Sequence, residues 1–167
     1  MPINYVKDFK ISTTKMQLPE LREKRIAKLL QIHTQLTLMY GERYREINGV
    51  LKDTREWEKD KNQSELTDAD KKKIVDAVSQ VRTDTVLFFK TVISRAEFLV
   101  NELMPGTFDV DPANQSLDTD DLFDIGSSIA VLGGAIAALG APPVGGAVAA
   151  FGAGMMLGAK VAEELYE

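Results

Sequence analysis

The sequence predicts an all-α protein, and three observations support this prediction. Apolar side chains recur at alternating steps of three and four residues along two stretches of about 40 residues each. Aromatic residues make up only 7% of the chain, and two of its six prolines stand together inside a third, apolar stretch. That stretch is rich in glycine and alanine and carries no charge. We therefore expect a long antiparallel two-helix coiled-coil rod followed by a Gly/Ala-rich hydrophobic helical hairpin.

The first rod helix is expected over residues 18 to 60. Pro19 suits its first turn, where an amide hydrogen has no helical partner to lose. Charged residues fill one face and an apolar stripe fills the other, so this stripe is expected to pack inward. The stripe consists of Ile26, Leu30, His33, Thr37, Tyr40, Tyr44, Ile47 and Leu51, widened on one side by Leu29, Leu36, Val50 and Trp57.

The second rod helix is expected over residues 67 to 104. Thr67 followed by Asp70 is typical of a helix N-cap, and Pro105-Gly106 is typical of a helix end. Lys71-Lys72-Lys73 is expected on the exposed face, with contact to anionic lipid headgroups as the alternative. The inward stripe consists of Ile74, Val78, Val81, Thr85, Phe88, Val92, Ala96, Leu99 and Leu103, broadened by Phe89 and Ile93.

Charge divides the 167-residue chain into regions with different compositions. Residues 1 to 106 hold 19 basic and 16 acidic side chains, residues 107 to 124 hold six aspartates and no base, and residues 125 to 159 hold no charge. Such segregation favours separate roles for the regions. Together with the helical patterns, this segregation divides the chain into four parts. These are a basic leader (1–17), the rod (18–105), an acidic linker and helix start (106–124), and the hydrophobic hairpin with its charged C-terminal end (125–167).

The acidic linker leads into the hairpin. Asp118 or Thr119 is expected to cap a third helix, whose Asp-rich first turn suits the positive end of the helix dipole. A calcium loop is the alternative, although no glycine turn or terminal glutamate completes one. The candidate pH-sensing residues are Asp118, Asp120, Asp121 and Asp124.

The hairpin is expected to consist of two apolar helical arms, because Gly140-Ala141-Pro142-Pro143 interrupts a helix between them. Nine of the twelve glycines lie between Gly126 and Gly158. Small residues spaced four apart share one helix face, so we expect the two arms to pack closely along such rows. The rows are Gly126, Ala130, Gly134 and Ala138 in the first arm, and Gly146, Ala150, Gly154, Gly158 and Ala162 in the second.

Two environments suit this hairpin. A helix that spans a bilayer needs about 20 apolar residues, and each arm, at about 16 residues, is slightly short. A hairpin of marginal length and hydrophobicity suits a protein that is soluble first and enters a membrane later. The alternative is a Gly/Ala-packed core within a soluble bundle or a large assembly.

Several site classes are disfavoured. The chain has no cysteine, which excludes disulfides and Cys-ligated metal. The spacing of Gly152, Gly154 and Gly158 resembles a dinucleotide fingerprint only faintly, since no βαβ context surrounds it. His33 lies on the apolar stripe and is expected to be a packed histidine. We expect no enzymatic activity, cofactor, metal, nucleic acid or small-molecule substrate.

The rod and the hairpin, over residues 18 to 160, resemble α-helical pore-forming toxins of the cytolysin A and haemolysin BL type. The hairpin from Ile125 to Ala159, with a charged tail behind it, also resembles the hydrophobic hairpin of colicin pore domains. The resemblance implies a membrane-active, soluble-to-inserted protein that oligomerises into a pore, with a lipid membrane and its own copies as partners.

Two other classes of function stay open. One is a structural or delivery component of a large assembly, for example a phage ejection protein, and the other is a soluble helical scaffold. Because Met1-Pro2-Ile3-Asn4 does not open an apolar signal, we expect secretion by a signal-independent route or carriage in a particle.

Overall fold

The computed structural model describes residues 19 to 60, 66 to 110 and 119 to 166, without the side chains of residues 19, 20 and 119 to 121. Within these residues every regular element is helical, which confirms the prediction of an all-α protein. The helices are α2 (Pro19–Lys59), α3 (Asp68–Leu103), α4 (Thr119–Ala138) and α5 (Pro142–Glu163), followed by the short 3₁₀ helix η2 (Glu164–Tyr166).

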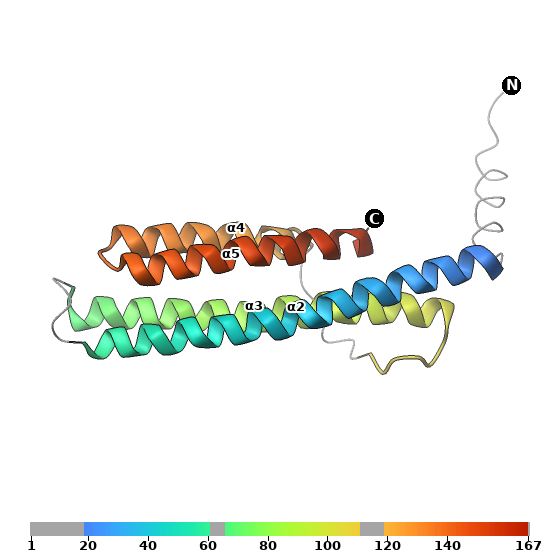
Figure 1. Ribbon diagram of the computed structural model, residues 1–167, viewed down its shortest axis with the longest axis horizontal. Coiled ribbons are helices and arrows are strands. Elements are labelled where there is room, and N and C mark those ends of the chain that lie inside the picture. The colour runs from blue at the N-terminus through green and yellow to red at the C-terminus, as the bar shows by residue number, and fades with distance from the viewer. Residues whose placement is uncertain (1–18, 61–65, 111–118, 167) are drawn as a thin grey trace, which may run out of the picture.

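The helices form two layers (Figure 1). The helix pair α2 and α3 makes one layer, and the hairpin of α4 and α5 makes the other, with α5 lying on α2. The hairpin helices have 20 and 22 residues against 41 in α2, so the hairpin covers only about half of the pair. The turn between α4 and α5, here called the tip, lies at the end of the pair where α2 ends and α3 begins. The start of α4 and the end of α5, here called the open end, lie near the middle of the pair.

The buried face of α3 is the one that the sequence predicts. Its stripe from Ile74 to Ala96 is buried, together with Phe89, while Leu99 and Leu103 are partly buried. The ends of α3 also follow their local signals. The Asp70 amide donates to Thr67 Oγ1 at 3.1 Å, and Gly106 takes a φ of 79° just beyond the helix.

The buried face of α2 is rotated from the predicted one. Thr37 and Tyr44, which were expected to face inward, are exposed, and the face is centred on the flank that was expected only to widen it. The rotation follows because α5 packs on α2 beside α3, so the helix has two neighbours to cover. The buried side chains of α2 are Leu29, Ile32, Leu36, Ile47, Leu51 and Thr54.

Lys71 was expected on the exposed face of its helix, and this expectation is wrong. The side chain is 4% exposed, and its Nζ donates to the Asp60 carbonyl oxygen at 2.9 Å. The ammonium also lies 5.4 Å from the centre of the Trp57 ring. A lysine buries its apolar stem readily when its charged end finds such partners. Lys72 and Lys73 are exposed, as expected.

His33 is packed between α2, α3 and the loop that follows α3. Its ring lies 4.7 Å from the Phe108 ring, and its Nε2 lies 3.5 Å from a Glu97 carboxylate oxygen. The loop folds back because the Asn101 side chain exchanges two hydrogen bonds with the Phe108 backbone, at 2.8 and 2.9 Å. The histidine therefore has a structural setting, in keeping with the expectation from its place on the stripe.

Candidate functional site: the uncharged hairpin

The two hairpin helices meet backbone to backbone. A Cβ added at Gly145 would lie 2.5 Å from the Ala137 amide nitrogen, and one added at Gly152 would lie 2.6 Å from the Ala130 amide nitrogen. Non-bonded atoms do not approach so closely. Glycine at these positions therefore sets the distance between the helices.

The contact between the arms follows steps of four and three, not four alone. Four residues turn a helix by about 400°, so a row of that spacing drifts around the axis, whereas seven residues return almost to the same side. The line through Gly126, Ala130, Gly133 and Ala137 meets Gly145, Ala149, Gly152 and Met156 of the other arm. Alternating steps of four and three among the small residues would have offered this line, with Gly133, Gly145 and Gly152, as a second candidate beside the rows with a fixed step of four.

The predicted rows are therefore split by the structure. Gly126 and Ala130 lie in the contact between the arms, but Gly134 and Gly146 have open space where a Cβ would stand, and Ala138 and Ala150 are exposed. As a description of how α4 packs on α5, the rows were wrong at these four positions.

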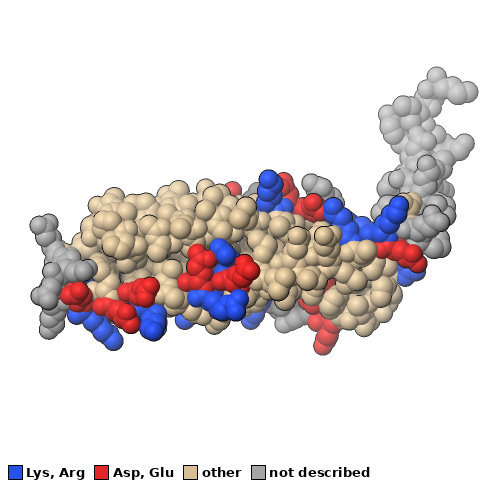
Figure 2. Space-filling model, viewed as in Figure 1, with Lys and Arg blue, Asp and Glu red and all other residues tan. Residues whose placement is uncertain are grey.

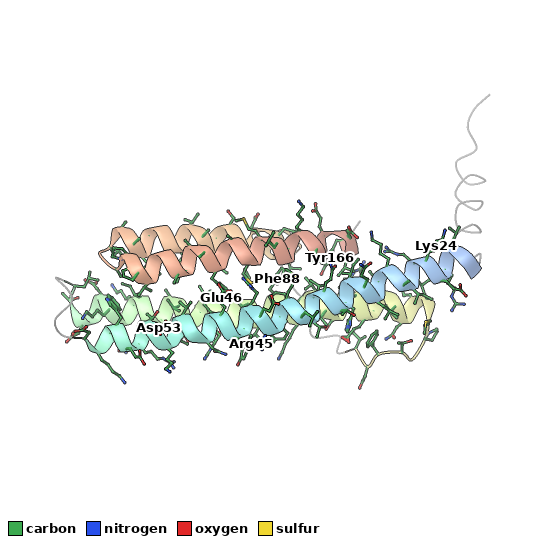
Figure 3. All side chains as sticks on the ribbon, in the orientation of Figure 1. Lys24, Arg45, Glu46, Asp53, Phe88 and Tyr166 are labelled. Carbon is green, nitrogen blue, oxygen red and sulfur yellow. The ribbon has the colours of Figure 1, made fainter. Side chains whose placement is uncertain are left out.

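The later members of the second row face the helix pair. Gly154 lies against the Arg43 side chain of α2, and a Cβ at Gly158 would lie 3.4 Å from the Phe89 ring and 3.6 Å from Met39 Cε. In Figure 3, Phe88 lies between the two layers, next to this position. Small residues at these positions allow α5 to pack closely against large aromatic side chains.

The charged pair Arg43 and Glu46 lies beneath the hairpin. Arg43 Nη1 lies 2.8 Å from a Glu46 carboxylate oxygen, one turn further along α2. Figure 3 shows Glu46 on the side of α2 that faces α5, whereas Arg45 points away from it. The guanidinium is thus paired with a carboxylate of its own helix, and it lies against α5 at Gly154.

The tip is formed as the sequence predicts. Pro142 and Pro143 are the first two residues of α5, where their missing amide hydrogens cost nothing. Gly140 takes a φ of 103°, a left-handed conformation that favours glycine. Ala141 is fully buried, and its carbonyl oxygen accepts a hydrogen bond from the Gly145 amide at 2.9 Å.

The outer face of the hairpin is uncharged and exposed. Figure 2 shows one continuous surface without charge over α4 and α5, while Lys, Arg, Asp and Glu gather on the helix pair and at the open end. Large apolar side chains stand on this face, with Val131 70%, Leu139 60% and Leu157 63% exposed. The rest of the face is mostly alanine, glycine and serine.

The length of the arms matches a membrane only narrowly. The uncharged part of α4 runs from residue 125 to 138, or about 21 Å, and that of α5 from 142 to 159, or about 27 Å, against about 30 Å of hydrocarbon. Among the described residues, one helix, from Pro142 to Tyr166, is long and apolar enough to cross a membrane, and Leu122–Ala138 is a shorter apolar helix. The core helix of a soluble protein passes the same test.

The candidate pH-sensing residues lie mostly outside the described part. This holds for Asp118 and for the side chains of Asp120 and Asp121, while Asp124 is exposed in the first turns of α4. The predicted cap at Asp118 or Thr119 also lies outside it, although α4 begins at Thr119.

No protein-family model, curated protein or solved structure matches this chain.

Proposed function

We propose that the chain is a membrane-active protein, soluble when made, whose hairpin enters a lipid bilayer and oligomerises into a pore or channel. The observation that carries the proposal is the uncharged outer face of the hairpin. Surfaces of soluble helical proteins normally mix charged residues among the apolar ones, and a large face without charge marks a site of contact with a membrane or another protein.

The packing inside the hairpin supports the same function. Contacts between glycine backbones depend on close van der Waals approach rather than on release of water, so they hold two helices together in lipid as well as in water. The contact through Gly133, Gly145 and Gly152 can therefore persist when the hairpin changes its surroundings. Between copies, contact would run through the small residues left exposed, Gly134, Ala138, Gly146 and Ala150.

A matched pair of substitutions tests the proposal by dye release from lipid vesicles. Leu157 on the hairpin and Leu38 on the helix pair are almost equally exposed, at 63% and 64%. Lysine at either place should leave the folded chain nearly as stable as before, because both side chains already face water. Inside a bilayer a lysine costs about 2.5–3.5 kcal/mol, so Leu157→Lys should slow dye release roughly a hundredfold. Leu38→Lys should release dye as the unaltered chain does.

Equal release by the two variants would contradict the proposal, and so would an unaltered chain that releases no dye from vesicles of any composition. The second candidate is a structural or delivery component of a large assembly, in which another protein covers the hairpin until release. The shortness of the α4 arm, at about 21 Å, favours that alternative. Copurification with a particle, with no dye release, would support it.

A further inference from the structure

The polar contacts between the hairpin and the helix pair gather at the open end. Arg95 of α3 donates from Nε to the Leu165 carbonyl oxygen at 3.3 Å, and its guanidinium lies 5.4 Å from the centre of the Tyr166 ring. Lys28 of α2 lies 3.2 Å from a Glu164 carboxylate oxygen. In Figure 3, Tyr166 stands at this end, where α5 runs into η2. These contacts are called the clasp below.

The tip is held differently. It rests on Val50 and Trp57 at the end of α2, beside an open cavity of about 410 Å³ that Pro143 and Ala147 line from the hairpin side. Within the described residues, no hydrogen bond or ion pair joins residues 125 to 159 to α2 or α3. Packing next to a cavity lacks part of its van der Waals contact, so this end is attached less firmly.

The hairpin itself is a rigid unit. Its arms touch backbone to backbone from Gly126 and Met156 near the open end to Gly133 and Gly145 near the tip. At the open end the Phe123 ring also packs edge to face on Tyr166, with centroids 5.7 Å apart, so the first arm is linked to the clasp as well. A rigid body that is fastened at one end and loosely seated at the other opens from the loose end.

We infer that the hairpin leaves the helix pair tip first and pivots about the clasp at its open end. The use of this motion for membrane entry rests on the proposed function, whereas the order of opening is a property of the bundle alone. Tip-first entry also fits the distribution of charge. The tip carries none, and Asp124, Lys160, Glu163 and Glu164 all stand at the open end, so the apolar arms enter first and these charged groups approach the bilayer last.

The order of opening can be measured in solution with single cysteines, because the chain has none of its own. Ala141 at the tip, Val148 two turns into α5 and Ala162 at the open end are all fully buried. Maleimide should modify Ala141→Cys and Val148→Cys roughly tenfold faster than Ala162→Cys, since partial opening exposes the first two sites only. Val148 distinguishes lifting of the hairpin from fraying of the turn. If Ala162→Cys fails to fold, Ala159→Cys takes its place as the probe of the open end. Equal or reversed rates overturn the inference.

Two cross-linked variants test the same order on vesicles. Val50→Cys with Ala147→Cys fastens the tip, and Lys28→Cys with Glu164→Cys fastens the clasp, each through a short bis-maleimide linker that contains a reducible disulfide. The tip-fastened chain should release no dye until the linker is reduced, whereas the clasp-fastened chain should release dye within about twofold of the unaltered rate. Blocked release in the clasp-fastened chain and free release in the tip-fastened chain would overturn the pivot and leave the membrane function standing. Absence of release from the unaltered chain, with the thiol rates in the expected order, would refute the membrane function and support the order of opening.

Discussion

The contact between α2 and α3 is built from large apolar side chains, whereas the contact between α4 and α5 is built from backbone against backbone. In the first, Phe89 has no exposed surface and stacks on Tyr40, and in the second, glycines at 133, 145 and 152 bring the two helices into direct contact. Burial of large side chains draws its free energy from water, so the helix pair is suited to water alone. Close backbone contact does not depend on water, so the hairpin is suited to either surrounding.

The solvent-facing sides of the two layers also differ, in their content of charged residues. The helix pair covers its outside with charged residues, while the hairpin leaves alanine, glycine and a few large apolar side chains open to solvent. One layer thus presents a charged outer surface, and the other presents an uncharged outer surface while the helix pair covers its inner face. The comparison suggests which substitutions should damage the whole bundle and which should damage the hairpin alone.

The largest effect is expected in the layer of large side chains. Phe88→Ala should lower the free energy of unfolding by about 3–5 kcal/mol, because it removes a fully buried ring and leaves a cavity between the two layers. The neighbouring Leu87 is 42% exposed, so Leu87→Ala should cost far less. Chemical denaturation followed by circular dichroism measures both. A similar cost for the two variants would show that the assigned face of α3 is wrong.

A smaller effect is expected in the hairpin, where the substitution adds an atom to a close contact instead of leaving a cavity. Gly145→Ala places a Cβ 2.5 Å from the Ala137 backbone, so it should force α4 and α5 apart and cost about 1–3 kcal/mol. The adjacent Gly146 has open space at its Cβ position, and Gly146→Ala should stabilise α5 by about 0.5–1 kcal/mol because alanine favours a helix. Denaturation of the two variants side by side checks the sign as well as the size. If the two variants were equally stable, α4 and α5 would not be in close backbone contact at Gly145.

The two layers also differ in how far the sequence could predict them. In α3 the apolar side chains are large and the polar ones are clearly separated, so the stripe from Ile74 to Ala96 was read correctly. In the hairpin nearly every residue is small or apolar, and a row such as Gly134 and Ala138 is as regular as the true contact line. Only the partner helix decides between the two lines, and the sequence does not show which side of α4 the partner takes.

Contacts between distant segments limited the prediction in α2 as well. Because α5 packs on α2, the buried face of α2 lies away from Tyr44. No local sequence pattern in α2 indicates that a second helix packs on it. Lys71 was misplaced for a related reason, since its burial depends on the Asp60 carbonyl and the Trp57 ring at the end of another helix. The turn at Gly140-Ala141-Pro142-Pro143 was predicted correctly because backbone chemistry alone determines it.

Acid is expected to promote entry of the hairpin into a membrane, while it leaves the helix pair outside the bilayer. Ionised carboxylates resist transfer towards hydrocarbon, and aspartates ordinarily titrate near pH 4. Dye release from anionic vesicles should therefore rise as the pH falls towards about 4–5, where the lipid surface also concentrates protons. Replacement of Asp118, Asp120, Asp121 and Asp124 by Asn should allow release at neutral pH.

The competing hypothesis makes the same aspartates a solubilising spacer and a helix cap. The Asn variant would then aggregate or lose helix without any gain in dye release. A flat pH profile of the unaltered chain between about pH 4 and 7.5 would also count against an acid trigger. It would leave the tip-first opening untouched, because that order does not depend on acid.

The smallest effect is expected at high pH, in the helix pair. Tyr40 stacks on Phe89, with ring centroids 5.4 Å apart, and lies edge to face with Tyr44. Burial, and then the nearby Tyr44, raise the pKa of Tyr40 above its ordinary value of 10.0. The folded chain therefore favours the neutral phenol more than the unfolded chain does. This contribution to stability is fully present below pH 10.0 and is lost as the pH rises through the pKa of the folded state.

Tyr40→Phe keeps the stacked ring and removes the titrating hydroxyl. It should change the stability little at neutral pH, and it should lose less stability than the unaltered chain between about pH 9 and 11. Tyr44→Phe is the matched control, because it removes only the second cause of the raised pKa and should reduce the loss by a smaller amount. Denaturant titrations at a series of pH values measure the three curves. Lysines also lose their charge in this range, and they do so in all three chains. The effect of Tyr40 is therefore read from the difference in stability between the chains at each pH. If Tyr40→Phe lost stability as steeply as the unaltered chain, the stacked contact between α2 and α3 would not be what holds the Tyr40 phenol neutral.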